Sequence, residues 1–443
     1  MRRPPATGRC STVADGWLVS VELHVVPGSR SSAPHRGPLV VGPSEHLLQA
    51  AKDEGLQTAV FAHDPQQYEL RPGLVDRWVR VDTSRVSDIV GAVDVLPGRT
   101  RALTSSVDNF IGVAATAAHR LGLAGPATSS ACIHRDKSLV RAALARAGVE
   151  SVAWQKHDVR DGVPRHSMPY PFVGKPVDGA ASFDVRLVED DDDFADLVEE
   201  HRRRDYGRGV RVKRELLLEE RLAGPVVSAE GFALRGGVEV FGFTDRLMGP
   251  EPAFVELGLR FDVGEPFPGA VAYVDEVLRA TGHTWGPFHV EFALTPQGPR
   301  IIEINARFVG GGMQHGLALT RPTSWARSHL LPALLGQEPE VAPSGPAVAE
   351  LKFGSPADGH LVAVTGLPDR LDATDVLGVG SYVTPPCDVS TVLASNGDRI
   401  GFVLAQGEDR DAAQASATRV LQDLRLTIED DRGRVARWAP RTP

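Results

Sequence analysis

The chain has 443 residues, too many for one compact core, which predicts about three domains. Apolar residues make up 42% and charged residues 24%, values ordinary for a globular protein. A net charge of −9 without a basic block argues against a nucleic-acid partner. Three well-separated cysteines (Cys10, Cys132 and Cys387) predict neither a disulfide framework nor a structural zinc site and favour a reducing, cytoplasmic location. Because no run of 18 apolar residues exists, we expect no membrane-spanning helix.

The first 126 residues predict an extension followed by a small domain. Residues 1–36 are rich in Arg, Pro, Ser and Gly, which predicts a flexible extension, although residues 17–26 are themselves strand-like. Residues 38–62 join two short apolar runs, PLVVG and TAVFA, through a segment with helical spacing. They predict a βαβ unit, and a further helix at Asp108–Leu121 completes an N-terminal domain of residues 37–126.

The rest of the chain predicts helices and antiparallel hairpins. We expect a helix over Ile133–Ala147, ended by Gly148 in the position that favours glycine. Glycine-containing turns predict hairpins at residues 226–246 and 288–308. Residues 341–443 combine strand-like segments with one helical pattern, which predicts a small third domain.

The return strand of the second hairpin, IIEINARF, carries the strongest signal of a site. Its residues alternate, so that Glu303, Asn305 and Arg307 share one face and the apolar residues, Ile302 included, share the other. A clean apolar face opposite three polar residues is typical of a sheet that packs on one side and binds a ligand on the other. Arg307 would then be aimed at an anion bound on the polar face.

The turn of this hairpin brings a second acid to the same face. If TPQGP is a five-residue loop, Leu294 pairs with Arg300 and Glu291 lies directly opposite Glu303. Opposed like charges destabilise a sheet, so we expect a cation between them, with Asn305 as a third ligand. An all-oxygen ligand set favours Mg²⁺ or Mn²⁺ over zinc. The alternative is an exposed polar face with incidental acids.

Two basic positions are candidates for binding phosphate. Lys175 ends the strand PFVGK and precedes a small-residue loop that contains Gly179 and Ser182, a workable phosphate cradle. A surface lysine before a turn is the other interpretation. Lys137 and Arg141, one helical turn apart, form a second basic pair that is equally compatible with a solvated helix face.

The segment LLLEERL, residues 216–222, runs from an apolar strand into two acids. Its end could offer backbone groups and a carboxylate from Glu219 or Glu220 to a flat ligand. It could equally be an edge strand whose charges block aggregation. The residues alone leave both interpretations open.

The order of these motifs resembles the layout of the ATP-grasp ligases. The likeness covers roughly residues 38–340 and rests on four segments: DKSLVRAALARAGV, VGKPVDGAASFDV, LLLEERLAGPVVSAEGF and HVEFALTPQGPRIIEINARFVGGG. Within that family, FTDRLMGPEPAFVELG is most similar to the ligases that join two amino acids. The resemblance implies an α/β (α+β ATP-grasp) fold, with an ATP-grasp domain of two α+β lobes at residues 127–340 and a small C-terminal α/β domain at 341–443.

The resemblance also implies ATP and Mg²⁺ or Mn²⁺ as cofactors, a small-molecule carboxylate and an amine as substrates, and no membrane partner, and it is compatible with a homodimer. The nucleotide-binding residues that it implies are Lys137, Lys175, Gly179, Ser182, Glu219, Glu220, Leu222 and Glu230. The substrate-binding residues are Glu256, His289, Arg307 and Gly312. The catalytic residues are Arg307, Gly310 and Gly311, which would stabilise the transferred phosphoryl group and the oxyanion that follows.

Three departures from the family pattern carry their own expectations. Ala181 and Asp184 stand where glycine is common, which implies a stiffer lid over the phosphates. Val226 replaces the acid that usually contacts the ribose, a role that Glu230 would take over. Leu259 stands where dipeptide ligases often have His, which implies a more apolar pocket for one substrate.

The activity that we expect is ATP-dependent joining of a carboxylate to an amine through an acyl phosphate. Two alternatives remain open at this point. One is a bicarbonate-activating carboxylase of the same superfamily, although the chain has no Met-Lys-Met biotin attachment segment. The other is a nucleotide-binding module without activity, which would not need the full set of acids and arginine on IIEINARF.

Overall fold

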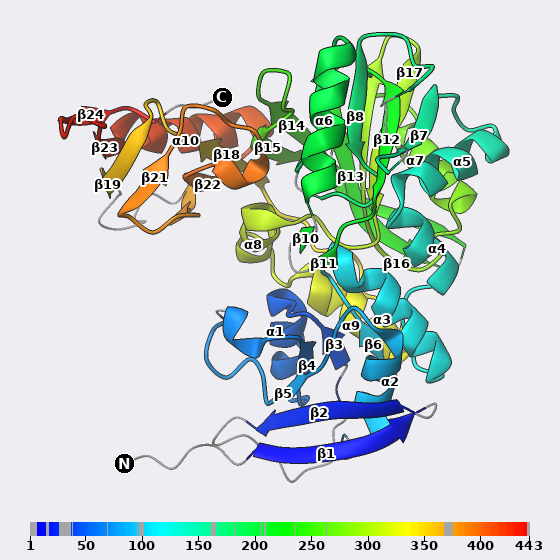
Figure 1. Cartoon of the computed structure of the whole chain (residues 1–443). Coiled ribbons are helices and arrows are strands. Elements are labelled where there is room, and N and C mark those ends of the chain that lie inside the picture. Colours follow the sequence, from blue (N-terminus) through cyan, green and yellow to red (C-terminus); the bar gives the residue numbers. More distant parts are fainter. Residues whose placement is uncertain are drawn as a thin grey trace.

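The computed structural model describes residues 7–14, 17–25, 37, 39–68, 70–94, 96, 102–160, 165–180, 182–204, 206–207, 210–234, 236–262, 264–366 and 375–440. Figure 1 shows an N-terminal unit below, a central unit above it, and a C-terminal unit beside the central one. Within the described ranges, no helix is long and apolar enough to cross a membrane.

The N-terminal unit is built on a six-stranded sheet of order β1-β2-β5-β4-β3-β6. Strands β5, β4, β3 and β6 run parallel to one another, and α1 connects β3 to β4, which confirms the βαβ unit. Apolar side chains of β3 and β4 are fully buried. The elements are β3 (Leu39–Val41), α1 (Glu45–Asp53), β4 (Ala59–Ala62), η1 (Pro65–Gln67), β5 (Arg77–Arg80), α2 (Val86–Asp94), β6 (Leu103–Thr104) and α3 (Asp108–Arg120).

The expected N-terminal extension is not loose in its described part. Strands β1 (Thr7–Ala14) and β2 (Trp17–Val25) pair antiparallel as a hairpin, and β2 pairs with β5 over residues 22–25. The hairpin therefore extends the sheet of the N-terminal unit (Figure 1). The expectation of a flexible extension is wrong for these residues, because the strand pattern noted at residues 17–26 finds a partner in the free edge of β5.

The first lobe of the central unit is a four-stranded antiparallel sheet of order β7-β12-β8-β9 with helix α6 packed against it. Its elements are β7 (Trp154–Asp158), β8 (Phe172–Pro176), β9 (Arg186–Val188), α6 (Asp191–Arg203), β10 (Tyr206–Gly207), β11 (Val210–Arg211) and β12 (Glu215–Glu220).

The helix expected at residues 133–147 is two helices, α4 (Thr128–His134) and α5 (Lys137–Ala147). The break falls at Asp136, whose carboxylate accepts the backbone N–H of Ser138 as an N-cap and so starts a new helix. Gly148 ends α5 with φ +72°, as predicted. The break matters for the site because it places Lys137 at the first turn of α5.

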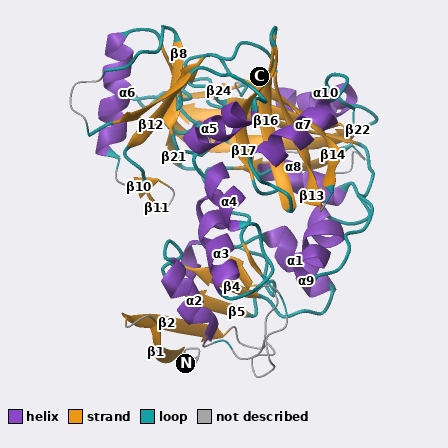
Figure 2. Ribbon diagram, turned by 90° about the vertical axis from the view of Figure 1, so that its right-hand side faces the viewer, coloured by secondary structure: helices purple, strands orange, loops and turns teal. Residues whose placement is uncertain are grey.

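The second lobe is part of an eight-stranded sheet of order β17-β16-β13-β14-β15-β18-β22-β20. Both predicted hairpins are present, as β13–β14 and β16–β17. The elements of this lobe are β13 (Val226–Leu234), β14 (Gly237–Met248), β15 (Glu256–Asp262), α7 (Ala270–Ala280), β16 (Gly286–Thr295), β17 (Gly298–Asn305), α8 (Gly311–Leu319), η2 (Ala326–Leu330) and α9 (Leu331–Leu335). Figure 2 shows the two lobes together above the N-terminal unit, with α4 lying between the lobes and α3.

The C-terminal residues are divided between two sheets: some of their strands join the eight-stranded sheet, and the others form a sheet of their own. Strand β18 pairs with β15 of the central unit, and β22 and β20 follow it in the same sheet. The remaining strands form a four-stranded sheet of order β21-β19-β23-β24. The elements are β18 (Ala347–Phe353), β19 (Gly359–Thr365), β20 (Val376–Ser381), β21 (Cys387–Val389), η3 (Asn396–Asp398), β22 (Gly401–Gly407), α10 (Arg410–Asp423), β23 (Arg425–Glu429) and β24 (Val435–Trp438).

Candidate active site

A cleft lies between the two lobes of the central unit. The four-stranded sheet forms one wall and strands β16 and β17 form the other. Its lining residues are Lys137, Val173, Lys175, Pro176, Gly179, Ala180, Ser182, Val185, Glu219, Glu220, Arg221, Leu222, Val226, Met248, Phe254, Glu291, Ile302 and Glu303. Seven of the eight residues expected to bind the nucleotide are among them; Glu230 is not.

At the inner wall, Glu219 is enclosed by two cations. Its carboxylate pairs with the Lys175 ammonium and accepts two hydrogen bonds from Arg141, at 3.0 and 2.8 Å. Burial opposes the charge of Glu219, but the attraction of Arg141 and Lys175 outweighs it and lowers the pKa of the carboxyl. Arg141 therefore does not face solvent, and the interpretation of Lys137 and Arg141 as a solvated helix face is wrong.

Lys137 reaches across the cleft from the start of α5. Its ammonium lies 2.9 Å from Glu303 Oε1 and donates to the carbonyl of Gly179 at 2.7 Å. It thus contacts both the opposite wall and the loop predicted to cover the phosphates. Gly179 lies 42 positions after Lys137 in the sequence and Glu303 much farther along, and the fold brings the three residues together.

The loop after Lys175 adopts backbone conformations that glycine prefers without using glycine. Ser182 and Asp184 both have φ of +56°, which costs on the order of 1 kcal/mol each. The Asp184 carboxylate accepts a hydrogen bond of 2.8 Å from Arg204, which fastens the loop to the end of α6. This anchoring agrees with the stiffer lid expected from Asp184, whereas Ala181 lies outside the described residues.

Glu291 and Glu303 lie directly opposite each other on β16 and β17, as predicted. The loop that produces this register differs from the prediction, because Leu294 pairs with Pro299, and Arg300 pairs with Ala293. Near the turn the pairing is therefore shifted by one residue on the β17 side, and a β-bulge opposite Glu291 and Phe292, with Ile302 as the extra residue, restores the opposition of the two acids.

The bulge also changes the faces of β17. Ile301 and Ile304 are fully buried in one hydrophobic cluster, whereas Ile302 lines the cleft beside Glu303. The predicted placement of Ile302 on the apolar face is therefore wrong. An extra residue in one strand shifts the alternation by one position, and strict period-2 counting cannot detect it.

The two opposed acids are neutralised by different partners. Glu303 pairs with Lys137, and Glu291 lies 3.2 Å from Arg246 Nη2 and 2.9 Å from His289 Nε2. Burial would raise the pKa of Glu291, but Arg246 and His289 lower it well below its usual range. The Glu291 carboxylate is thus ionised, as a cation ligand must be.

The donor chemistry of this pair fits Mg²⁺ or Mn²⁺. Mg²⁺ is usually held by one or two carboxylates, with the remaining positions filled by water and substrate phosphates. In the described part of the chain, no group of three or more His, Cys, Asp or Glu side chains is arranged to hold a metal ion. Asn305, the expected third ligand, is buried and lines a small cavity behind Glu303, with Asp108 and His134.

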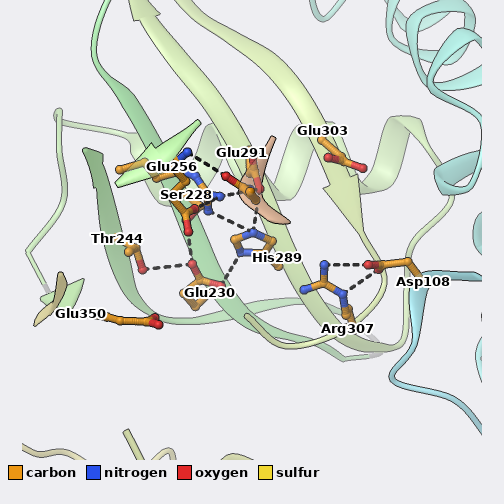
Figure 3. Close-up of polar contacts among 12 residues, drawn as sticks. Asp108, Ser228, Glu230, Thr244, Glu256, His289, Glu291, Glu303, Arg307 and Glu350 are labelled. Atoms are coloured by element: carbon orange, nitrogen blue, oxygen red, sulfur yellow. Dashed lines mark hydrogen bonds and ion pairs between the residues drawn. The ribbon is translucent and has the colours of Figure 1, made fainter. Parts of the chain in front are cut away.

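Arg307 is engaged by a residue that the sequence did not indicate. Its guanidinium holds Asp108 of α3 through a two-point ion pair, Nε to Oδ1 at 2.6 Å and Nη2 to Oδ2 at 2.8 Å (Figure 3). Burial works against the charge of Arg307, and Asp108 restores it and raises its pKa. Gly310 lies alongside, since an added Cβ there would be 3.6 Å from Arg307 Nη1.

Gly310 to Gly312 form the start of α8, as a glycine-rich turn beside Arg307. Gly311 has φ of +68°, a conformation that favours glycine. The N–H of Met313 is already taken by the buried Glu350 carboxylate at 3.0 Å. The predicted oxyanion donors are therefore the N–H groups before Met313.

Glu230 does not occupy the place expected for a ribose ligand. It is fully buried on β13 and accepts hydrogen bonds from Ser228 at 2.7 Å and Thr244 at 3.0 Å (Figure 3). Its other oxygen lies 2.8 Å from His289 Nδ1. The prediction that Glu230 replaces the acid lost at Val226 is wrong, because Glu230 is fully buried inside the sheet and does not line the cleft.

His289 links Glu230 to Glu291. Burial alone would lower its pKa, but the Glu230 carboxylate beside it, with help from Glu291, raises the pKa to about 9. A protonated His289 then donates to both acids, at 2.8 and 2.9 Å. His289, expected to contact substrate, thus contacts the two acids Glu230 and Glu291 in this structure.

Glu256, expected to bind substrate, is held by two cations from neighbouring strands. Arg246 of β14 and Lys352 of β18 both pair with its carboxylate. Burial opposes its charge, yet Arg246 and Lys352 lower the pKa of Glu256 to about 2. Leu259, expected in a substrate pocket, belongs instead to a hydrophobic cluster that includes Met313.

Arg246, Lys352 and Asp108 are the site residues that the sequence interpretation missed. Lys352 and Glu350 offered a signal, since two charges in the otherwise apolar run AVAELKF of β18 are unusual in a buried strand. Asp108 gave none, because an acid at the first turn of a helix is ordinary.

Comparisons with known proteins agree with this geometry. Residues 168–315 match the ATP-grasp domain, and residues 352–429 match the L-amino acid ligase C-terminal domain 2. The L-amino acid ligase from Bacillus licheniformis has a similar structure, with a TM-score of 0.73 and 18% identity, over 90% of this chain and 100% of that one. Phosphoribosylglycinamide synthetase from Anaerococcus prevotii follows, with a TM-score of 0.63 and 15% identity, over 89% and 100%.

Two relatives are similar in sequence. Protein y4rH of Sinorhizobium fredii, itself uncharacterised, is 28% identical over 86% of this chain and 80% of its own length. Dapdiamide A synthase of Enterobacter agglomerans is 28% identical over 46% of this chain and 50% of its own. The chain has the ATP-grasp fold. More particularly, it is an ATP-grasp ligase that carries an L-amino acid ligase C-terminal domain.

Proposed function

We propose that the protein joins a carboxylic acid, an amino acid or a related compound, to an amine or amino acid, with conversion of ATP to ADP and phosphate through an acyl phosphate. The observation that carries the proposal is the convergence on one cleft of Lys137, Lys175 and the opposed acids Glu291 and Glu303, with Arg307 beyond them on the same strand end. Such a set matches phosphoryl transfer, where catalysis is mainly positioning and charge stabilisation.

The base of ATP would lie at the end of the cleft lined by Glu220 and Leu222, and its phosphates at the end lined by Lys137 and Lys175. The two lysines offset phosphate charge, and the loop around Ser182 covers it. A bound Mg²⁺ or Mn²⁺ would be held by Glu291 and Glu303, with Asn305 nearby, and would neutralise charge that develops on the phosphates.

Arg307 would orient the substrate carboxylate for in-line attack on the γ-phosphate. The ion pair with Asp108 takes the Nε edge of the guanidinium and fixes its orientation, so the substrate carboxylate would be held by the remaining N–H groups of Nη1 and Nη2. The acyl phosphate then meets the amine, and the N–H groups at Gly310 to Gly312 stabilise the oxyanion. The amine displaces phosphate, so one C–N bond forms as one C–O bond breaks.

The relatives narrow the class of substrate. The match of residues 352–429 to the L-amino acid ligase C-terminal domain favours an amino acid over bicarbonate as a reactant. Similarity to dapdiamide A synthase over about half of each chain supports amide formation on an amino acid. Neither alternative left open by the sequence has an observation of its own in its favour.

The test is a phosphate-release screen of amino acids, singly and in pairs, with ATP and Mg²⁺. Turnover that requires two partners and yields ADP and phosphate is the expected result. AMP and diphosphate as products would contradict the acyl-phosphate scheme. Turnover with bicarbonate and no amino acid would favour the carboxylase, and ATP binding without turnover across the screen would favour a binding module.

A further inference from the structure

A buried chain of four alternating charges runs behind the cleft, from Lys175 through Glu219 and Arg141 to Glu150. Lys175 pairs with Glu219 Oε1, and Arg141 Nη2 lies 2.8 Å from Glu219 Oε2. Arg141 Nη1 lies 2.7 Å from Glu150 Oε1. All four side chains are no more than 5% exposed.

The two side chains at the ends of this row of charges, Glu150 and Lys175, hydrogen-bond to adjacent backbone groups of β17. Glu150 Oε2 accepts the N–H of Ile301 at 2.9 Å, and the Lys175 ammonium donates to the carbonyl of Ile302 at 3.4 Å. The four side chains and β17 therefore form a closed ring. Because β17 is an edge strand of the eight-stranded sheet, these backbone groups face away from β16 and need partners from elsewhere.

The ring closes at the β-bulge of β17, the strand that precedes Arg307 and carries the proposed metal ligand Glu303. Ile301 and Ile302 are the two residues between which the alternation of β17 changes, and Glu303 follows directly. The bulge decides that Ile302 lines the cleft and that Glu303 opposes Glu291. Side chains that hydrogen-bond to the backbone of this bulge therefore control the position of the Glu303 carboxylate.

Stability alone gives little reason for four buried charges in this place. Burying ions costs several kcal/mol each, and well-packed apolar residues often replace a buried ion pair at no loss of stability. Neither Arg141 nor Glu150 is among the residues that line the cleft, so they do not contact the nucleotide there. A role through Lys175 and Glu303, which do line the cleft, accounts for both.

We propose that Arg141 and Glu150 are positioning residues, which fix the separation between the phosphate-binding Lys175 and the metal carboxylate Glu303. This rests on the proposed function. A ring of this kind connects the four-stranded sheet, the proposed nucleotide wall, to strands β16 and β17, the proposed metal wall. Its main effect should therefore be on the factor by which bound metal raises the affinity for the nucleotide, and bound nucleotide the affinity for the metal. Binding free energies coupled in this way change reciprocally.

The experiment measures that coupling on the full chain. The affinity for ADP is determined by calorimetry with Mn²⁺ present and with a chelator, and the affinity for Mn²⁺ by electron paramagnetic resonance with and without ADP. Arg141→Met should reduce the factor by which Mn²⁺ tightens ADP binding by about tenfold or more, the scale of losing a group that orients a metal ligand. Arg141→Lys should fail to restore it, because an ammonium cannot hold Glu219 and Glu150 together.

A matched control is Lys156→Met, which breaks the 2.7 Å ion pair with Glu215 in the same sheet but outside the ring. Its coupling factor should stay within about twofold of the wild-type value, since additive behaviour is expected of sites without shared partners. Circular dichroism and the melting temperature verify the fold of each variant. If Arg141→Met does not fold, Glu150→Gln, which keeps an acceptor for Ile301, should still show a severalfold loss.

The outcomes separate this inference from the function on which it rests. Full coupling in Arg141→Lys, or coupling within twofold of wild type in Arg141→Met or Glu150→Gln, would overturn the positioning role and leave the ligase assignment intact. A wild-type chain that binds no ADP would overturn both. Wild-type binding of ADP that Mn²⁺ does not strengthen would overturn the ring as a link between the two walls.

Discussion

The two walls of the cleft handle charge in opposite ways. On the nucleotide wall, Glu219 is about 4% exposed and is enclosed by Lys175 and Arg141. On the wall formed by β16 and β17, the proposed metal wall, Glu291 and Glu303 keep 15% and 22% of their side-chain surface. Glu303 pairs with Lys137 across the cleft, and Glu291 contacts Arg246 and His289 within the sheet. The first arrangement is complete within the protein. The second leaves carboxylate oxygens facing the cleft.

This difference separates the charges that hold the site together, such as Glu219, from those that would bind a ligand, Glu291 and Glu303. A buried acid with all its partners in place is rigid, and losing one partner leaves an unpaired charge at a cost of about 3–5 kcal/mol. A partly exposed acid can exchange an ammonium for a metal ion with little reorganisation. We therefore expect changes on the metal wall to affect turnover and changes on the nucleotide wall to affect binding and stability.

Glu303→Gln should have the largest effect and sharpen the comparison most. The change removes a charge from the metal pair but leaves a side chain of the same size, so turnover should fall below detection with the melting temperature within about 2 °C of wild type. Steady-state phosphate release and a thermal melt measure the two quantities. Glu199→Gln, on the exposed face of α6, is the control and should keep full activity. Wild-type activity in Glu303→Gln would mean that the cation binds elsewhere.

Arg307→Lys should come next. Lysine keeps the charge but cannot grip a carboxylate at two points, so ATP binding should survive and kcat should fall by roughly 10²-fold or more, the scale of losing one oriented donor. Single-turnover kinetics with a separate measurement of the ATP Kd distinguish the two. A lower ATP affinity with unchanged kcat would place Arg307 on the nucleotide. A near-native rate would mean that position 307 contributes charge alone.

Lys175→Ala tests the nucleotide wall. Its removal takes one cation from the phosphates, so the KM for ATP should rise more than the KM for the acid substrate, with ATP binding weaker by about tenfold. Glu219 retains Arg141, so the free energy of unfolding should drop by only about 1–3 kcal/mol. Urea unfolding measures the second effect. A rise confined to the KM of the acid substrate would move Lys175 to the substrate pocket.

The smallest effect is a pH dependence of stability that comes from a buried histidine pair behind the metal wall. The rings of His134 and His283 lie 5.2 Å apart. Burial lowers the pKa of His283 to about 4, and burial and His283 lower that of His134. As the pH falls from 6.5 toward 4, these histidines bind protons in the unfolded chain but not in the folded chain. The free energy of unfolding therefore decreases, by about 3 kcal/mol for His283.

His283→Gln should remove this contribution, so that its unfolding free energy changes less between pH 7 and pH 5 than that of the wild type. His360→Gln, at an exposed position, provides the control and should keep the wild-type slope. Urea titrations at pH 7 and pH 5 measure the change in unfolding free energy for each protein. Equal slopes for the wild type and His283→Gln would show that the pair carries no such linkage.

Local sequence pattern predicted the elements well and their long-range partners poorly. The βαβ unit and both hairpins follow from apolar periodicity and turn residues, which act over a few positions. The opposition of Glu291 and Glu303 was also predicted, but the structure reaches it through a different turn and a compensating bulge. The bulge at Ile302 was not predictable from IIEINARF, and the side chains that hydrogen-bond to its backbone, Glu150 and Lys175, lie far away in the sequence.

The same limit applies to partners in the site. The grip of Arg307 on Asp108 joins residues 199 positions apart, and the pairing of Lys352 with Glu256 depends on β18 joining the central sheet. Chain order cannot show which strands become neighbours. Glu230 was misplaced for a related reason, since its three polar neighbours come from three different strands.

The most direct test of the account is the fate of oxygen in the reaction. Once the screen has identified an acid substrate, its carboxylate is labelled with ¹⁸O, and the products are analysed by ³¹P nuclear magnetic resonance and mass spectrometry. An acyl phosphate predicts ADP and one ¹⁸O atom transferred to each phosphate released, because the carboxylate oxygen attacks the γ-phosphate and leaves with it. Unlabelled phosphate, or label appearing in AMP with release of diphosphate, would contradict the central claim.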